Sequence, residues 1–145
     1  MVDELRAVVK ELGGKSTFRR QLRNEYDLRD AIREGFPTAA IKGLMQAASL
    51  TLSELASSLD LSARSLQRRR RSGRLARYES DRLYRLARIV ALAEECFASR
   101  DKAIHWLKQS NPALGGIRPL ESLDTELGAR QVENLLGRIA YGGIS

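Results

Sequence analysis

The chain has 145 residues, enough for one domain of moderate size or two small ones. Hydrophobic residues make up 43% of it and aromatic residues only 6%, which excludes a wholly disordered chain and predicts a core built mainly from Leu, Ala, Ile and Val. The net charge of +7 favours an anionic partner, with nucleic acid first and a membrane surface second.

The positive charge is concentrated in the first part of the chain. Residues 1–80 hold 16 Lys and Arg against 10 Asp and Glu, whereas residues 81–145 hold 9 against 8. Between Leu61 and Tyr78 there are seven arginines and no acidic residue. This asymmetry predicts that the two halves bind different partners.

Sequence features also bear on the compartment. Cys96 is the only cysteine, so no intramolecular disulfide can form, and a reducing, cytoplasmic setting is expected. No apolar run approaches the roughly 18 residues of a membrane span, and the N-terminus lacks the layout of a signal peptide. We therefore expect no membrane partner.

Apolar residues recur at helical spacing and do not alternate with period two, so the fold is predicted to be all-α. A first helix ends at Gly13-Gly14. Ser16 is expected to cap a second helix, which restarts near Asp27, and Gly35-Phe36-Pro37 breaks the chain. The next helix has Pro37 in its first turn.

From residue 51 onwards the expected boundaries rest on capping residues. Thr51 and Glu54 form a capping box that opens a helix through Leu59, and Ser62 caps the next helix, which Gly73 ends. Three further elements are expected: a long helix from Ser80 to Phe97, a helix capped by Ser99 and ended at Asn111-Pro112, and, after the bend NPALGGIRP, a last pair of helices with Leu120, Leu123, Val132, Leu135, Leu136 and Ile139 inward.

The segment TLSELASSLDLSARSLQRRRR, residues 51–71, predicts an Xre/Cro-like helix-turn-helix. Its leucines are spaced so that two short helices close on one core, and Ala56 is small where the second helix approaches the first. The turn has Leu59-Asp60 where Gly is usual, and Asp tolerates the left-handed conformation that the turn requires.

The arginines of this segment predict a DNA-reading face. At about 100° per residue, with Leu66 inward, the side chains of Arg64, Arg68 and Arg71 point away from the protein towards base edges. Ser65 and Gln67 flank them and are also suited to contact bases. A second set is expected, by elimination, to contact phosphates: Arg69, Arg70, Arg74 and Arg77. A solvated charge run and a basic localisation tag are the two alternatives.

Three blocks in the second part of the chain carry a family resemblance. They are ESDRLYRLARI at Glu79–Ile89, NPALGG at Asn111–Gly116, and PLESLDTELGARQVENLLGRIAYG at Pro119–Gly142. In this order they resemble the toxin-binding domain of the Xre/MbcA/ParS antitoxins, although Leu127 is larger than the residue expected in the last block. The resemblance implies an antitoxin encoded beside a RES-domain toxin, an enzyme that destroys NAD. It implies that the second domain blocks the toxin's active site and that the first binds and represses the antitoxin's own promoter.

These inferences divide the chain into a helix-turn-helix DNA-binding domain, residues 1–77, and a toxin-binding domain, residues 78–145. We expect a symmetric homodimer on a palindromic operator, because one short recognition helix reads few bases, with residues 1–50 as the dimer contact. The alternative is a stand-alone helix-turn-helix repressor whose second half only dimerises.

The C-terminal tail supplies the candidate toxin-facing residues. They are Arg138, Tyr141, Gly142, Gly143, Ile144 and Ser145, with Arg130, Glu133 and Asn134 at the rim. A short tail with Arg and flexible Gly is suited to enter a cleft built for an anionic dinucleotide. In the alternative interpretation, Tyr141 closes the core and the last residues are frayed. Asp124 and Thr125 are expected to cap the last helix and not to touch the toxin.

Catalytic chemistry is not expected. His105 is the only histidine and does not have metal-ligand spacing with Cys96, so we predict no metal and no cofactor. No pairing of a nucleophile with a base is recognisable, which argues against an enzyme and against a small-molecule substrate.

Overall fold

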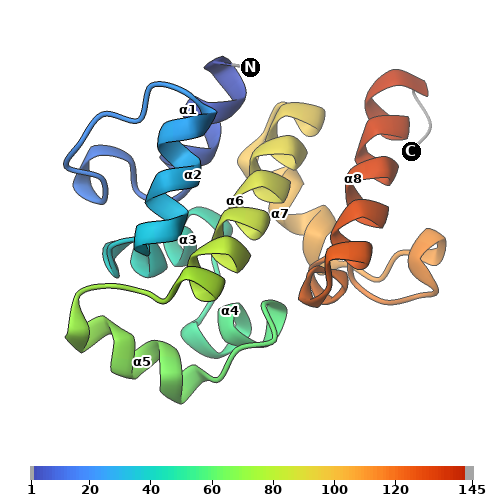
Figure 1. Ribbon diagram of the computed structural model, residues 1–145. Helices are drawn as coiled ribbons and strands as arrows, with labels where there is room; N and C mark the ends of the chain where they lie inside the picture. The colour runs from blue at the N-terminus through green and yellow to red at the C-terminus, as the bar shows by residue number, and fades with distance from the viewer. Residues whose placement is uncertain (1, 143–145) are drawn as a thin grey trace.

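The computed structural model describes residues 2–142, and every regular element within them is helical, which confirms the predicted fold class. The elements, shown in Figure 1, are α1 (Val2–Glu11), η1 (Gly14–Ser16), α2 (Glu25–Glu34), α3 (Ala39–Ala48), α4 (Leu52–Ser58), α5 (Ala63–Ser72), α6 (Arg77–Phe97), α7 (Arg100–Lys108), η2 (Pro112–Leu114), η3 (Pro119–Asp124) and α8 (Glu126–Gly142). Within this range no helix is both long and apolar enough to cross a bilayer.

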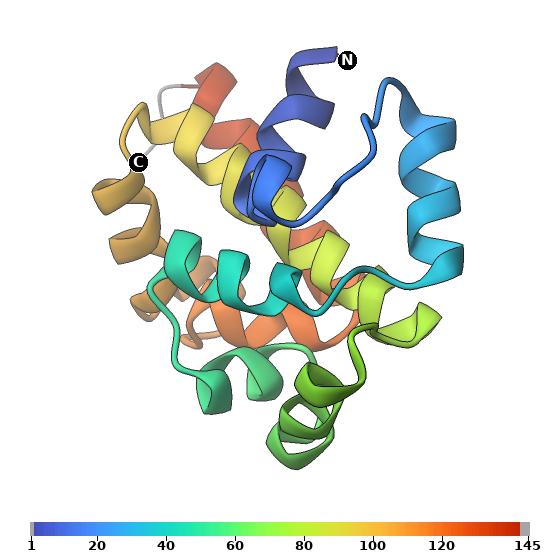
Figure 2. The ribbon, with the colours of Figure 1, turned by 90° about the vertical axis from the view of Figure 1, so that its left-hand side faces the viewer.

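Helix α6 is the centre of the fold. Helices α1, α2 and α3 pack against it on one side and α7 and α8 on the other, as Figures 1 and 2 show together. Its Leu83, Leu86, Ile89 and Val90 have no exposed surface. They belong to one contiguous core that extends from α1 to α8. The buried residues of α6 spread over a wide face of the helix because it has neighbours on two sides.

The segment between α1 and α2 departs from the prediction. Ser16 does not cap a helix: its hydroxyl donates to the Gly13 carbonyl at 2.6 Å and closes a single 3₁₀ turn. Phe18 is buried against Phe36, with ring centroids 5.4 Å apart and nearly perpendicular planes. This contact between distant residues holds the segment irregular, and α2 begins only where the Asn24 side chain caps it.

The start of α6 also differs, by one turn. The sequence places its first residue at Ser80, but Ser80 lies inside the helix, fully buried. Its hydroxyl donates to the Ala76 carbonyl at 2.9 Å and accepts a hydrogen bond from the Phe36 amide at 2.8 Å. The helix begins at Arg77, where Glu79 accepts from the Ala76 amide at 2.7 Å. Ser80 therefore joins α6 to the loop before α3.

Four other predicted boundaries are confirmed. The capping box of Thr51 and Glu54 opens α4, the Ser62 side chain caps α5, and the Ser99 side chain caps α7. Gly73 ends α5 with φ 89°, a left-handed conformation that favours glycine. Of the predicted last pair, only α8 is an α-helix, and Pro119–Asp124 forms a 3₁₀ helix before it.

Candidate functional sites

The helix-turn-helix lies between residues 52 and 72. Leu55 and Leu59 of the first helix and its turn meet Leu66 of α5, and none of the three has exposed surface. The turn closes with the Leu61 amide donating to the Ala56 carbonyl at 2.8 Å. Asp60 adopts φ 54°, so the left-handed residue that the turn requires is present without glycine.

Helix α5 is buried only through Leu66 and turns a basic face to solvent. Arg64, Gln67, Arg68 and Arg71 are exposed on that face, where the helical spacing places them. Three arginines lie in the last turn of α5, where the helix dipole favours positive charge, whereas its first turn has Arg64 and no acidic residue to favour the dipole. The exposed part of α5 thus combines hydrogen-bond donors with positive charge.

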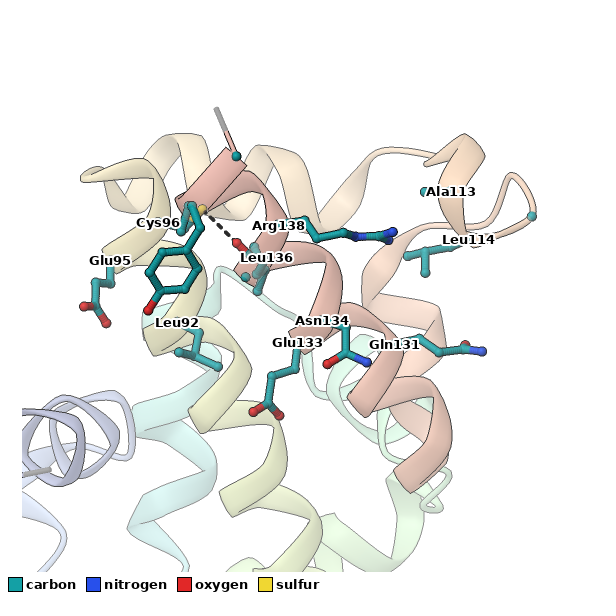
Figure 3. Close-up of a pocket in the computed structure, with 15 residues that line it drawn as sticks. Leu92, Glu95, Cys96, Ala113, Leu114, Gln131, Glu133, Asn134, Leu136 and Arg138 are labelled. Carbon is teal, nitrogen blue, oxygen red and sulfur yellow. Dashed lines mark hydrogen bonds between the residues drawn. The ribbon is translucent and has the colours of Figure 1, made fainter. Parts of the chain in front are cut away.

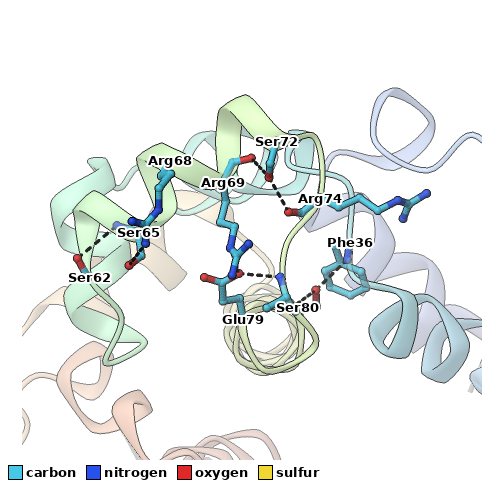
Figure 4. Close-up of polar contacts among 10 residues, drawn as sticks. Phe36, Ser62, Ser65, Arg68, Arg69, Ser72, Arg74, Glu79 and Ser80 are labelled. Carbon is cyan, nitrogen blue, oxygen red and sulfur yellow. Dashed lines mark hydrogen bonds and ion pairs between the residues drawn. The ribbon is translucent and has the colours of Figure 1, made fainter.

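The four arginines expected on phosphates differ in their surroundings, and Figure 4 shows two of them, Arg69 and Arg74. Arg70 and Arg77 are exposed, although one Arg70 nitrogen also lies 3.3 Å from the Gln67 side-chain oxygen. The Arg69 Nε lies 3.1 Å from Oε1 of Glu79, a residue with no exposed surface. Arg74 donates from Nη1 to the Gly35 carbonyl at 2.8 Å. Arg69 and Arg74 therefore bind parts of the protein far away along the chain, whereas the Arg70 contact lies within α5.

Helix α6 contacts the turn of the helix-turn-helix through Arg82, which sequence reasoning did not single out. Its Nη1 donates to the carbonyls of Asp60 at 2.8 Å and Leu59 at 3.2 Å. Its guanidinium carbon lies 5.5 Å from the centre of the Tyr78 ring. The only signal in the sequence was an arginine between inward-facing residues of a long helix.

Two more arginines follow Arg82 on α6 at intervals of three residues, and both bind the C-terminal part. Arg85 donates to the Leu123 carbonyl at 3.0 Å, and Arg88 forms an ion pair with Glu133 of α8. The block ESDRLYRLARI therefore consists largely of residues that join α6 to its neighbours. The three-residue spacing of its arginines reflects these contacts.

The predicted toxin-facing side chains of α8 share one face of the helix. Arg130, Asn134, Arg138 and Tyr141 recur at intervals of four, four and three residues, and all are exposed. Tyr141 is 95% exposed, so the interpretation that it closes the core is wrong. The reason is that the core-facing positions of α8 are filled by Ala129, Val132 and Leu136, on the other side of the helix.

The remaining predicted toxin-facing residues lie elsewhere. Glu133 is half-buried at the edge of this face because its carboxylate pairs with Arg88. Gly142 ends α8, whereas Gly143, Ile144 and Ser145 lie outside the described residues. Thr125 caps α8 as predicted, with its hydroxyl accepting from the Gly128 amide at 2.9 Å.

An open groove of about 1490 Å³ runs along α8 (Figure 3). It is lined by the end of α6 with Leu92, Glu95 and Cys96, by the bend at Ala113–Gly115, and by α8 from Gln131 to Gly142. Burial and the neighbouring Glu95 raise the pKa of the Cys96 thiol, so Cys96 is not an activated nucleophile. Among residues 2–142, no group of three or more metal-ligating side chains is present.

Comparisons with known proteins match a different family model to each part of the chain. Residues 27–88 match the family model of the antitoxin Xre-like helix-turn-helix domain, and residues 92–142 match that of the antitoxin Xre/MbcA/ParS C-terminal toxin-binding domain. The block Glu79–Ile89 therefore falls almost entirely within the helix-turn-helix match, and α6 spans both matches.

Several individual proteins are similar over most of their length. Antitoxin Xre of Yersinia enterocolitica is 35% identical over 118 residues, 80% of this chain and 80% of that protein. Antitoxin Xre of Pseudomonas putida is 34% identical over 123 residues, 84% of this chain and 76% of that protein. A chain in the crystal structure of the M. tuberculosis MbcT–MbcA toxin–antitoxin complex superposes with a TM-score of 0.57 at 25% identity, covering 74% of this chain and 96% of that one.

Proposed function

Because this chain belongs to the Xre/MbcA/ParS family of antitoxins, we propose that it neutralises a RES-domain, NAD-degrading toxin and represses its own promoter. The family is one of binding proteins without catalytic activity. The toxin-binding role is assigned to the C-terminal half and the DNA-binding role to the helix-turn-helix. The two roles rest on different surfaces and are tested separately.

The exposed face of α8 is the observation that supports the toxin-binding role best. A protein partner needs exposed side chains that lose water when it binds, and Arg and Tyr are enriched at the centres of such interfaces. Arg138 and Tyr141 stand on that face beside the groove and lead directly into the last residues of the chain. The α8 face and the tail form one candidate contact surface for the toxin.

This surface would neutralise the toxin by keeping the substrate out of its active site. We propose that the tail from Tyr141 to Ser145 enters the NAD cleft of the toxin while Arg130 and Asn134 contact its rim. A cleft that binds an anionic dinucleotide presents donors and positive charge, and an active site also holds polar and acidic groups that an arginine such as Arg138 pairs with. Occupation of the cleft excludes the substrate without any chemistry by the antitoxin.

Truncation after Ala140 tests this role. The shortened chain is expected to fail to rescue growth and cellular NAD when the RES-type enzyme encoded beside it is expressed. Binding to promoter DNA is expected to be unchanged, since α5 is far from the end of α8 (Figure 1). Full rescue by the truncated chain would remove the tail from the mechanism, and absence of an adjacent RES-type gene would remove the proposed toxin.

The basic face of α5 supports the DNA-binding role. Arg64, Arg68 and Arg71 point away from the core, and arginine forms two hydrogen bonds with the major-groove edge of guanine. Ser65 and Gln67 lie beside them and are suited to read further bases. Exposed Arg70 and Arg77 are proposed to contact phosphates, as is Arg74 through the nitrogens that do not bind Gly35.

Two single substitutions distinguish base reading from phosphate contact. Arg68→Ala is expected to weaken binding to one base pair of the operator by about 1–3 kcal/mol and to relax the sequence preference there. Arg70→Ala is expected to weaken binding to all sequences alike. It is also expected to reduce by about one the salt slope, the steepness with which the logarithm of the binding constant falls with the logarithm of the salt concentration. Equal losses for both variants on all sequences would show that the two faces of α5 are wrongly assigned.

A homodimer remains part of the proposal because a two-fold operator needs two recognition helices. Light scattering of the free protein and of its operator complex measures the stoichiometry. One chain per operator would refute the symmetric arrangement.

A further inference from the structure

We propose that Arg69, Glu79 and Arg82 are positioning residues that fix the orientation of α5 for DNA reading. None of them need contact DNA. This inference rests on the proposed DNA-binding function, and it changes the role of Arg69, which the sequence alone places on a phosphate. The three residues connect the recognition helix to α6 at two separate points.

The first point is the last turn of α5. Arg69 reaches across to Glu79 near the start of α6, with Nε 3.1 Å from Oε1, as Figure 4 shows. The same Glu79 oxygen accepts the Ala76 amide at 2.7 Å, so it caps α6 while holding α5. The carboxylate is fully buried, whereas the Arg69 side chain is 40% exposed.

The second point is the turn that precedes α5. Arg82 lies one turn of α6 beyond Glu79 and donates to the carbonyls of Leu59 and Asp60. These carbonyls follow the end of α4, where the last carbonyls of a helix lack partners within it. A positive charge at this end is also favoured by the helix dipole. Arg82 thereby fixes the turn from which α5 departs.

Energetics favour a fixed role for Arg69 over a phosphate contact. If Arg69 moved to a phosphate, it would leave the Glu79 carboxylate buried without its cation, and an uncompensated buried charge is strongly unfavourable. Arg68 and Arg70 are exposed, and their side-chain contacts, with Ser65 and Gln67, lie within α5, so both can turn to DNA without leaving a buried carboxylate. The run of four arginines therefore contains one that holds the helix in place.

The consequence for DNA binding is specific. Bidentate readout by arginine requires the helix to lie within a narrow range of angles in the groove, whereas phosphate attraction tolerates misalignment. Loss of either contact is expected to reduce the preference for operator over random DNA while leaving overall electrostatic attraction intact. Loss of a phosphate contact is expected to weaken binding to all DNA and to leave the preference for operator over random DNA intact.

Glu79→Gln distinguishes a positioning role of Arg69 from a phosphate contact, because the two roles predict changes of opposite sign in DNA binding. If Arg69 positions the helix, Arg69→Ala lowers the operator preference about 10-fold, and Glu79→Gln lowers it by less, because the amide oxygen still accepts from Arg69. The double variant loses no more than Arg69→Ala, because both changes act on one interaction. Their salt slopes match the unmodified protein. If Arg69 serves a phosphate, Glu79→Gln frees it and strengthens binding to all DNA, and Arg69→Ala lowers the salt slope by about one. That result would overturn the inference.

Arg82 is tested alongside by Arg82→Ala, with Arg82→Lys expected to restore part of the preference because an ammonium group still donates to carbonyls. Lys102→Ala, which removes one exposed positive charge on α7, is the control for net charge. A salt slope lower by one for Arg82→Ala but not for Lys102→Ala would show that Arg82 contacts phosphate and would refute its positioning role.

Hydrogen exchange tests the inference without DNA. In Glu79→Gln and Arg82→Ala, amides of α5 are expected to exchange at least about 10-fold faster, while amides of α7 keep their rates. Unchanged exchange in α5 would refute the positioning role. An unmodified chain that shows no preference for its own promoter would instead refute the proposed function, so the two failures are distinguishable.

Discussion

Glu11 is predicted to make the stability of this protein fall as the pH rises through neutrality. Its side chain is only 2% exposed, where α1 meets α6 and α7. Arg100 lies 3.6 Å from Glu11 and also 3.6 Å from Glu94, so one cation serves two carboxylates. Burial and the adjacent Glu94, which hydrogen-bonds to it, raise the pKa of Glu11 from 4.5 to about 8 despite Arg100. At neutral pH the cluster therefore holds a proton.

The size of the effect follows from the pKa of Glu11. As the pH rises from 4.5 to about 8, the unfolded chain loses this proton while the folded chain retains it, so the free energy of unfolding decreases over that range. The total loss is on the order of 5 kcal/mol, since each pKa unit corresponds to about 1.4 kcal/mol. Below this range both states are protonated and the full stability is present.

Glu11→Gln removes the titration and retains the shape of the protonated carboxyl. Urea unfolding at a series of pH values is expected to give nearly equal stabilities for the two proteins at about pH 4, with the variant more stable by a few kcal/mol at about pH 9. Glu95→Gln, an exposed position on α6, is the control and is expected to follow the unmodified protein. Parallel curves for Glu11→Gln and the unmodified protein would refute the reasoning.

Three further predictions concern single positions. Gly128→Ala is expected to destabilise the protein by several kcal/mol, because the added Cβ would lie 1.9 Å from the Ser122 carbonyl oxygen. Gly137→Ala on the same helix is the matched control: its Cβ meets nothing within 4 Å, and the variant is expected to raise the melting temperature. Asp60→Val is expected to lose about 1–2 kcal/mol at its left-handed φ while Asp60→Gly loses little, as thermal unfolding would show. Alkylation of Cys96 is expected to be slower than that of a free thiol at the same pH and to accelerate in Glu95→Gln, because Glu95 contributes to the raised pKa.

Local signals in the sequence were sufficient for most of the helix-turn-helix. The Thr51 capping box, the Ser62 cap and the Gly73 terminus depend on interactions within a few residues, so they were predictable from spacing. The inward direction of Leu66 follows from helical periodicity. The exposed side of α5 was predictable for the same reason.

Where segments that are distant in the sequence meet, local sequence signals gave a wrong prediction or none. Serine often stands at the start of a helix, and the sequence places Ser16 and Ser80 there. In the structure Ser16 closes a 3₁₀ turn before a segment that Phe18 anchors against Phe36, and Ser80 accepts a hydrogen bond from the Phe36 amide inside α6. The exposure of Tyr141 depended on which face of α8 meets the core, and a spacing pattern alone did not select it.

The sequence by itself determined the helical class, the helix-turn-helix and its basic face, because periodicity, capping and charge are local properties. Only the tertiary structure decided which arginines are free. Arg69 faces a buried carboxylate and Arg82 faces two backbone carbonyls, while Arg68 and Arg70 remain exposed. These partners are 10 to 23 residues away along the chain and come within reach only because the fold brings the first turns of α6 to α5 and to the turn after α4.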